Sequence, residues 1–155
     1  MALSEKHKNK ARGWIRVTMV FVAVLLLFFA VVIPIINNVI ALGVENELKD
    51  LPLPPDTELV ESISKAGRWV SRGGGMQYFG SVLIKTELPT EDLLKYYDAY
   101  NCFVFPQSSA DITVAEGKLT YRHEGYGDGY YTVYRWGSAP NWLADLLDTD
   151  MRGTE

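Results

Sequence analysis

The stretch "MQYFGSVLIKTEL" at residues 76–88 has the alternation of a β-strand that lies in the middle of a sheet. One face carries Met76, Tyr78, Val82 and Ile84, and the other carries Phe79 and Leu83. Aromatic and β-branched side chains on both faces are typical of a strand covered from both sides. Gly80 interrupts the run and indicates either a bulge or close packing against a neighbour.

Three glycines, Gly73–Gly75 in "SRGGGMQYFG", come directly before this strand. A phosphate-binding loop would need a lysine motif or a helix after the glycines, and neither is present. The glycines are therefore predicted to form a turn that leads into the strand. Because three glycines exceed what a tight turn needs, a close approach of another group to the backbone at Gly74 is the alternative.

The chain around this strand predicts an α+β domain over residues 57–148. A strand is expected in "TELVESISKAGRWV" (residues 57–70), and a helix capped by Thr90 in "PTEDLLKYYDAY" (residues 89–100). The segment "IKTELPTEDLLKYY" loosely resembles the strand-then-helix pattern of many small bacterial extracytoplasmic domains, a likeness that specifies no activity. The expected architecture is an antiparallel sheet with one helix packed on it.

The later strands are expected to end in a hairpin. "GYGDGY" at residues 125–130 contains Asp-Gly, which favours a tight turn between "KLTYRHEG" and "YYTVYRW". Its register stays open in the sequence, since Leu119 aligns with either the Tyr134 side or the Val133 side of the following strand. A short closing helix is expected within "SAPNWLADLLDTD" (residues 138–150).

The N-terminal part predicts a transmembrane helix over residues 17–42. Its core, "VTMVFVAVLLLFFAVVIPII" (residues 17–36), has 20 uncharged residues, enough to span a hydrocarbon layer of about 30 Å at about 1.5 Å per residue. A cleaved signal peptide is the alternative, but its apolar region is typically shorter, about 7–15 residues.

The flanking charges predict the orientation of this helix. The first 16 residues contain five basic side chains (Lys6, Lys8, Lys10, Arg12 and Arg16) and one acidic side chain, Glu5. Basic flanks stay in the cytoplasm. The chain therefore divides into a cytoplasmic N-terminus (1–16), the transmembrane helix (17–42), a helical extension with a Pro-rich spacer (43–56), the extracytoplasmic domain (57–148) and a C-terminal tail (149–155).

Small and polar side chains in the apolar helix suggest a contact with a second helix. Ala23, Ala30 and Asn37 are spaced by seven residues, which would place them on one side of a regular helix. Besides the lipid bilayer, another membrane protein or a second copy is thus an expected partner. Nucleic acid is not, because residues 43–155 carry 18 acidic and 10 basic side chains, a formal charge of −8.

The chemical groups of the chain do not form a recognisable catalytic set. Cys102 lies in the apolar run "NCFVFP" and is predicted to be a buried hydrophobe, although it and His123 are the two groups that a hydrolase would use. No spacing of histidine, cysteine or carboxylate indicates a metal site, and no cofactor motif is present.

These patterns predict a membrane-anchored extracytoplasmic interaction or accessory module, a non-enzymatic subunit of a membrane assembly. Tyr126, Tyr130 and Trp136, together with Gly74, are the expected contact residues, because tyrosine and tryptophan are enriched in interfaces. Two alternatives stay open. The first is a cell-envelope module that stacks a small ligand or carbohydrate on Tyr126, Tyr130 and Trp136, and the second is a hydrolase.

Overall fold

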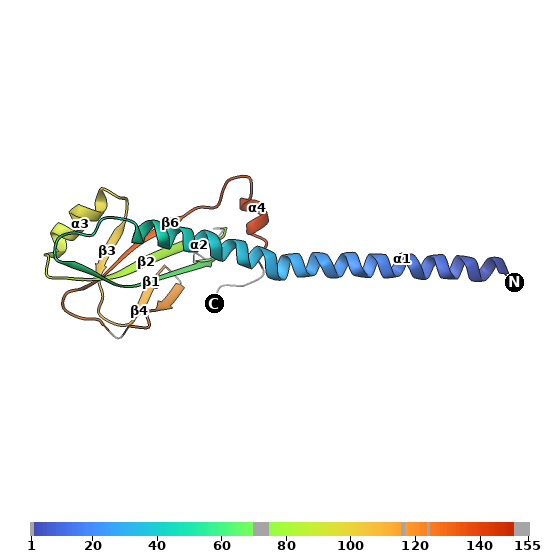
Figure 1. The fold of residues 1–155 in the computed structure, drawn as a ribbon, viewed down its shortest axis with the longest axis horizontal. Coiled ribbons are helices and arrows are strands. Elements are labelled where there is room, and N and C mark those ends of the chain that lie inside the picture. The colour runs from blue at the N-terminus through green and yellow to red at the C-terminus, as the bar shows by residue number, and fades with distance from the viewer. Residues whose placement is uncertain (1, 70–74, 116, 124, 151–155) are drawn as a thin grey trace.

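The computed structural model describes residues 2–69, 75–115, 117–123 and 125–150 of the chain. Its N-terminal part is one continuous helix, which protrudes far beyond a small folded domain (Figure 1). This helix consists of α1 (Ala2–Leu27), a π-helical turn (Phe28–Val32) and α2 (Ile33–Lys49). Among the described residues it is the one helix long and apolar enough to cross a membrane.

The domain is built on a four-stranded antiparallel sheet with the strand order β1-β2-β6-β3. The strands are β1 (Thr57–Gly67), β2 (Gln77–Thr86), β6 (Tyr130–Gly137) and β3 (Phe103–Pro106). A separate hairpin and two short helices complete the fold. The hairpin consists of β4 (Asp111–Val114) and β5 (Gly117–Thr120), and the helices are α3 (Thr90–Asp98) and α4 (Ala144–Leu147). The predicted α+β class, and the predicted interior position of the strand that starts near Met76, are confirmed.

Both faces of β2 are buried, as its alternating pattern predicts. Val82 and Ile84 belong to a core cluster that includes Leu48 of α2 and Leu93 and Tyr97 of α3. The opposite face has its own cluster, which includes Phe79 and Leu83 of β2, Trp69, and the hairpin residues Ile112 and Leu119. The sheet is therefore a middle layer between helices and the β4–β5 hairpin.

Helix α2 is part of this core, which corrects the expected domain boundaries. Ala41, Val44 and Leu48 are buried against the sheet, so the helix does not extend into solvent as predicted for residues 43–49. The Pro-rich stretch that follows connects α2 to β1 inside the domain instead of spacing the domain from a membrane. Two helices, α2 and α3, pack on the sheet where one was expected.

Two glycines allow α2 to approach the sheet closely. A Cβ atom at Gly80 would lie 2.7 Å from the backbone nitrogen of Glu45, and one at Gly137 would lie 2.2 Å from Cγ2 of Val44. Of the two explanations offered for Gly80, close packing is the one that the structure supports. The carboxylate of Glu45 lies at this contact between α2 and the sheet, where it accepts hydrogen bonds of 2.6 Å from Ser62 and Ser64 of β1.

The predicted hairpin between the fifth and sixth strands is wrong. β5 pairs with β4, with Leu119 opposite Ile112, whereas β6 inserts between β2 and β3, with Val133 opposite both Val82 and Val104. Burying apolar β6 in the middle of the sheet outweighs the local turn signal. Thr90 is also not a cap: α3 starts after Pro89 without a side-chain cap, and the Thr90 hydroxyl lies 3.2 Å from the Tyr131 hydroxyl.

Candidate functional site: the free edge of strand β3

Strand β3 is an edge of the sheet, and its outer side is unpaired in the part of the chain that the structure describes. The other edge, β1, carries Glu58, Glu61 and Lys65 along its length, and charged side chains protect an edge from pairing with other strands. β3 has the sequence Phe-Val-Phe-Pro and no charge. Pro106 lacks an N–H group and β3 is short, but Phe103–Phe105 form the edge that no charged side chain protects.

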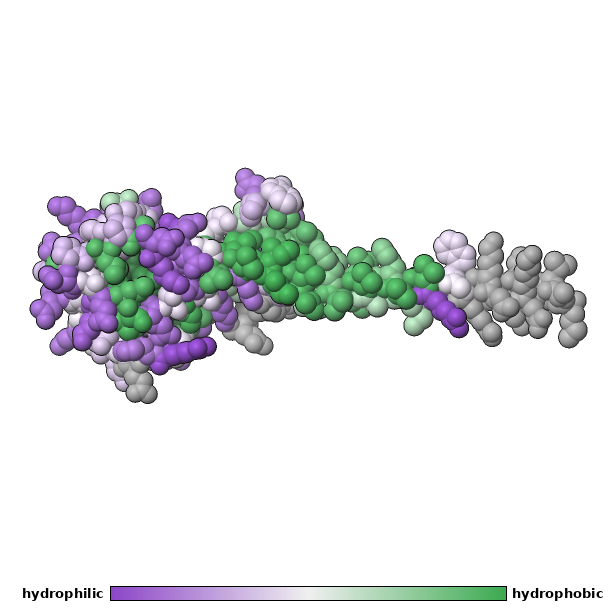
Figure 2. Space-filling view, viewed as in Figure 1, coloured by the Kyte–Doolittle hydropathy of each residue, from purple (hydrophilic) through white to green (hydrophobic). Residues whose placement is uncertain are grey.

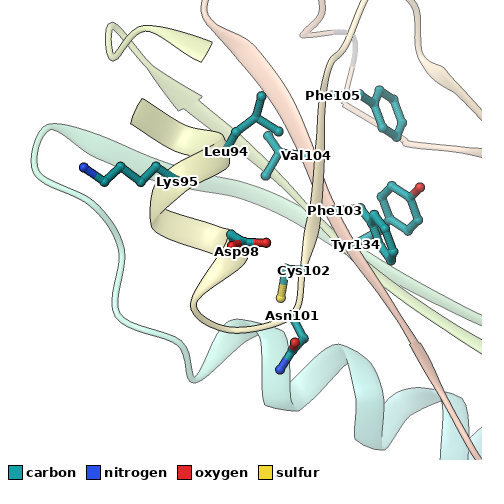
Figure 3. A pocket seen from close by; sticks show the side chains of 9 residues that line it. All are labelled: Leu94, Lys95, Asp98, Asn101, Cys102, Phe103, Val104, Phe105 and Tyr134. Atoms are coloured by element: carbon teal, nitrogen blue, oxygen red, sulfur yellow. The ribbon is translucent and has the colours of Figure 1, made fainter. Parts of the chain in front are cut away.

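A groove of about 590 Å³ runs along this edge between α3 and β3. Figure 3 shows its two sides: Leu94 and Val104 point toward each other between helix and strand, and Phe103, Phe105 and Tyr134 lie beyond the strand. Leu94 is 47% exposed and Phe103 is 55% exposed. Large apolar side chains thus face solvent on both sides of an unpaired strand.

An aromatic stack holds the outer side of the groove in place. The ring of Phe103 stacks on Tyr134 with centroids 5.1 Å apart and planes at 24°. Tyr134 in turn contacts Phe105 and the fully buried Phe79, and its burial raises the pKa of its hydroxyl. Phe103 is therefore an exposed ring on a fixed base, which is the arrangement of an interface anchor.

Cys102 lies at the start of the groove and is buried, as predicted. Burial raises the pKa of its thiol, an effect opposed by the charge of Arg135. The Sγ atom lies 3.5 Å from the carbonyl oxygen of Tyr100, to which it donates. A thiol with a raised pKa is a poor nucleophile at neutral pH, so Cys102 contributes packing to this site.

The aromatic residues expected to form the contact surface do not gather at one place. Tyr126 is 52% exposed in the loop before β6. Trp136 is half-buried in the core, in ring contact with Trp69 and Phe79. Tyr130 is also half-buried, with the Lys85 ammonium over its ring, and it is six residues from Trp136 on β6, about 20 Å at about 3.3 Å per residue. Gly74 lies outside the described residues.

Asn37 is not open to a helix of another protein, which corrects its expected role. Its side chain is fully buried within the chain: Nδ2 donates to the Leu147 carbonyl oxygen at 3.2 Å and to Oδ2 of Asp150 at 2.8 Å, and Oδ1 accepts from the Tyr78 hydroxyl at 2.8 Å. Burial and the nearby carboxylates of Asp148 and Asp150 raise the pKa of Tyr78 to about 12, so its hydroxyl stays a donor.

The π-helical turn explains why the seven-residue spacing of Ala23, Ala30 and Asn37 does not place them on one side of the helix. A π turn holds more residues than an α turn, so residues before Phe28 and after Val32 do not keep the alignment of a regular helix. Ala23 and Ala30 are exposed, and their contact with another helix stays a prediction.

His123, the other group considered for catalysis, has surroundings unlike those of the buried Cys102. His123 is exposed, and its Nδ1 accepts a 2.7 Å hydrogen bond from the Gly125 amide. Within the described ranges, no three histidine, cysteine or carboxylate side chains are grouped so that they could hold a metal ion.

The groove itself was missed because its sequence signal is ambiguous. Phe103 and Phe105 alternate with Val104 in a run that is equally typical of a buried strand. The one local sign was Pro106, because proline in a strand indicates an edge.

No family model, no curated protein and no solved structure matches this chain. The geometry of its described residues is therefore the basis for assigning a function.

Proposed function

We propose that this protein is a single-pass membrane protein whose extracytoplasmic domain is an interaction module. In this role it is a non-enzymatic accessory subunit that binds an extended segment of a partner protein along β3. The observation that carries the proposal is the unpaired, uncharged edge of β3 with the exposed Phe103 and Leu94 beside it.

The membrane anchor is supported by the surface of the protruding helix. Most apolar side chains from Val17 to Val32 are exposed, as are Ile35, Val39 and Leu42, and Figure 2 shows a continuous hydrophobic surface along the helix that reaches the more hydrophilic domain. The 20 uncharged residues of 17–36 span about 30 Å at about 1.5 Å per residue, the thickness of a hydrocarbon core. The five basic residues within residues 1–16 favour a cytoplasmic N-terminus.

An extended partner segment suits the open edge of β3. Added strands bind through main-chain hydrogen bonds and place alternate side chains in flanking pockets, and β3 offers an open edge between Leu94 and Phe103. Figure 1 shows β1 and β2 running roughly along the axis of α2, whereas β3, at the far edge of the twisted sheet, lies at a steep angle to it.

The test uses the full chain in its native membranes. A photoreactive amino acid at position 103 should crosslink to a single partner, and the crosslinked peptide should be a segment that adds to β3 as a strand. Phe103→Asp should abolish co-purification of that partner, since loss of an interface anchor costs about 2 kcal/mol or more, about 30-fold in affinity.

Tyr126 provides the matched control, because it is an aromatic residue of similar exposure outside the groove. Tyr126→Asp should leave the partner bound. Retention of the partner in both variants, or a chain that extracts without any partner, would count against the proposal. Loss only with Tyr126→Asp would place the contact at the loop before β6 instead.

A further inference from the structure

The segment around α4 carries the most exposed large hydrophobic side chain of the described residues. Trp142 is 82% exposed, and α4 starts two residues later. Tryptophan is enriched at the membrane–water interface, because its ring is apolar and its N–H group is polar.

The position of this segment is fixed by buried contacts with α2. The Leu147 side chain is fully buried, and its carbonyl oxygen and the Asp150 carboxylate both accept hydrogen bonds from Asn37. The Asp148 carboxylate also accepts a 2.5 Å hydrogen bond from the Met76 amide. The segment is therefore held against the helix on several sides.

These contacts place the segment at the boundary expected for the bilayer. Asn37 directly follows the uncharged stretch of residues 17–36, and exposed apolar side chains lie around it at Ile35, Val39 and Leu42. Figure 1 shows α4 at the end of the domain from which α1 protrudes, and Figure 2 shows this region directly beside the hydrophobic surface of the helix. The polar layer of a bilayer adds about 5–8 Å on each side of the hydrocarbon, so the segment lies within its reach.

We infer that the segment from Pro140 to Leu147 is a second membrane contact, with Trp142 inserted among the lipid headgroups. This inference goes beyond the binding of a partner at β3 and rests only on the anchoring part of the proposed function. The contact is apolar, not ionic: Asp145 is exposed and would disfavour anionic lipids, and the segment has no basic side chain. The domain would thus be held to the bilayer at two points.

A fluorescent probe that is quenched by brominated lipid tests this contact directly. In a Cys102→Ala background, the full chain carries the probe at Asn141→Cys, an exposed neighbour that leaves Trp142 intact, and is reconstituted in phosphatidylcholine vesicles. Quenching is expected at position 141, and Trp142→Ser should remove most of it. Adding phosphatidylglycerol should not increase it.

Two reference positions make the outcome decisive. A probe at Phe21→Cys in the protruding helix should be strongly quenched. A probe at Glu87→Cys should not be, since Glu87 directly follows the end of β2 and lies nine residues from Tyr78, about 30 Å from the Asn37 contact. Quenching at 21 with none at 141, or quenching at 141 that survives Trp142→Ser, overturns the inference but leaves the anchor intact. A blue shift at 141 without quenching would mean that protein covers it, and overturns it too. No quenching at 21 would refute the anchor itself.

Discussion

Replacing Gly80 with alanine should destabilise the domain, because α2 crosses β2 at this residue. The new Cβ atom would lie 2.7 Å from the Glu45 nitrogen and 2.9 Å from the Val44 carbonyl carbon, where ordinary contacts begin at 3.4 Å. Both atoms are backbone, so relief requires the helix to move away from the sheet. Overpacking of this kind costs about 1–3 kcal/mol, and alanine returns about 0.5–1 kcal/mol of chain entropy in a strand.

The net loss of about 1 kcal/mol should lower the melting temperature of the purified full chain in detergent by roughly 4–8 °C. Unfolding can be followed by the near-UV circular dichroism of the packed rings of Trp69, Phe79 and Trp136. Gly43→Ala is the matched control, because nothing lies within 4 Å of its Cβ position in α2. It should be neutral or stabilising by up to about 1 kcal/mol. An unchanged or raised melting temperature for Gly80→Ala would refute the close crossing.

Three further predictions concern the same domain. Asn37→Ala should lower the free energy of unfolding by about 2–4 kcal/mol, since it removes three buried hydrogen bonds, one of them to the Asp150 carboxylate. The same melting assay measures this loss. A loss of less than about 0.5 kcal/mol, which is typical of a surface substitution, would contradict the hydrogen-bond network. A chain that starts at residue 57 should show no cooperative unfolding, whereas one that starts at residue 33 should, because α2 supplies part of the core; equal behaviour of the two would show that α2 is dispensable. The raised pKa of Cys102 means that the protonated thiol favours the folded state, a contribution present below the ordinary thiol pKa and lost as pH rises through the higher folded value. Its alkylation near pH 8.5 should accordingly be much slower in the native than in the unfolded chain, and equal rates would exclude a buried thiol.

The fold around β2 was predictable because its information is local. Apolar side chains on both faces of residues 76–86 are buried only if other elements cover both faces, and the clusters around Val82 and Phe79 show that both are covered. The period-3.6 pattern of Leu93 and Tyr97 likewise fixed the buried face of α3.

The role of α2 was not predictable, because both of its faces are apolar. Ala41 and Val44 pack on the sheet, while Val39 and Leu42 are exposed. Periodicity distinguishes faces only by a difference in polarity, and here the difference is weak, because the buried face includes the polar Asn37 and Glu45. The buried Glu45 was a clue, but its partners Ser62 and Ser64 are distant in sequence.

The strand pairing of β6 and the candidate site could not be predicted from the sequence for a related reason. Asp-Gly favours a tight turn between adjacent strands, and the positive φ angles at Gly127 and Gly129 show that a turn does form there. Which strand β6 then joins depends on Val133 meeting Val82 and Val104, contacts that no local pattern encodes. The free edge at Phe103 follows from that same pairing, so it became visible only with the sheet order.

The continuity of the long helix with the domain core changes how the proposed sites relate to each other. A Pro-rich spacer would let the domain move independently of a membrane anchor, whereas α2 is both the continuation of α1 and a layer packed on β1 and β2. Any tilt of the helix is then transmitted to the sheet, apart from what the π-helical turn at Phe28–Val32 absorbs. The free edge of β3 would therefore be presented at a set height and orientation above the bilayer. A contact at Trp142 can fix that orientation only because no flexible linker separates it from the helix.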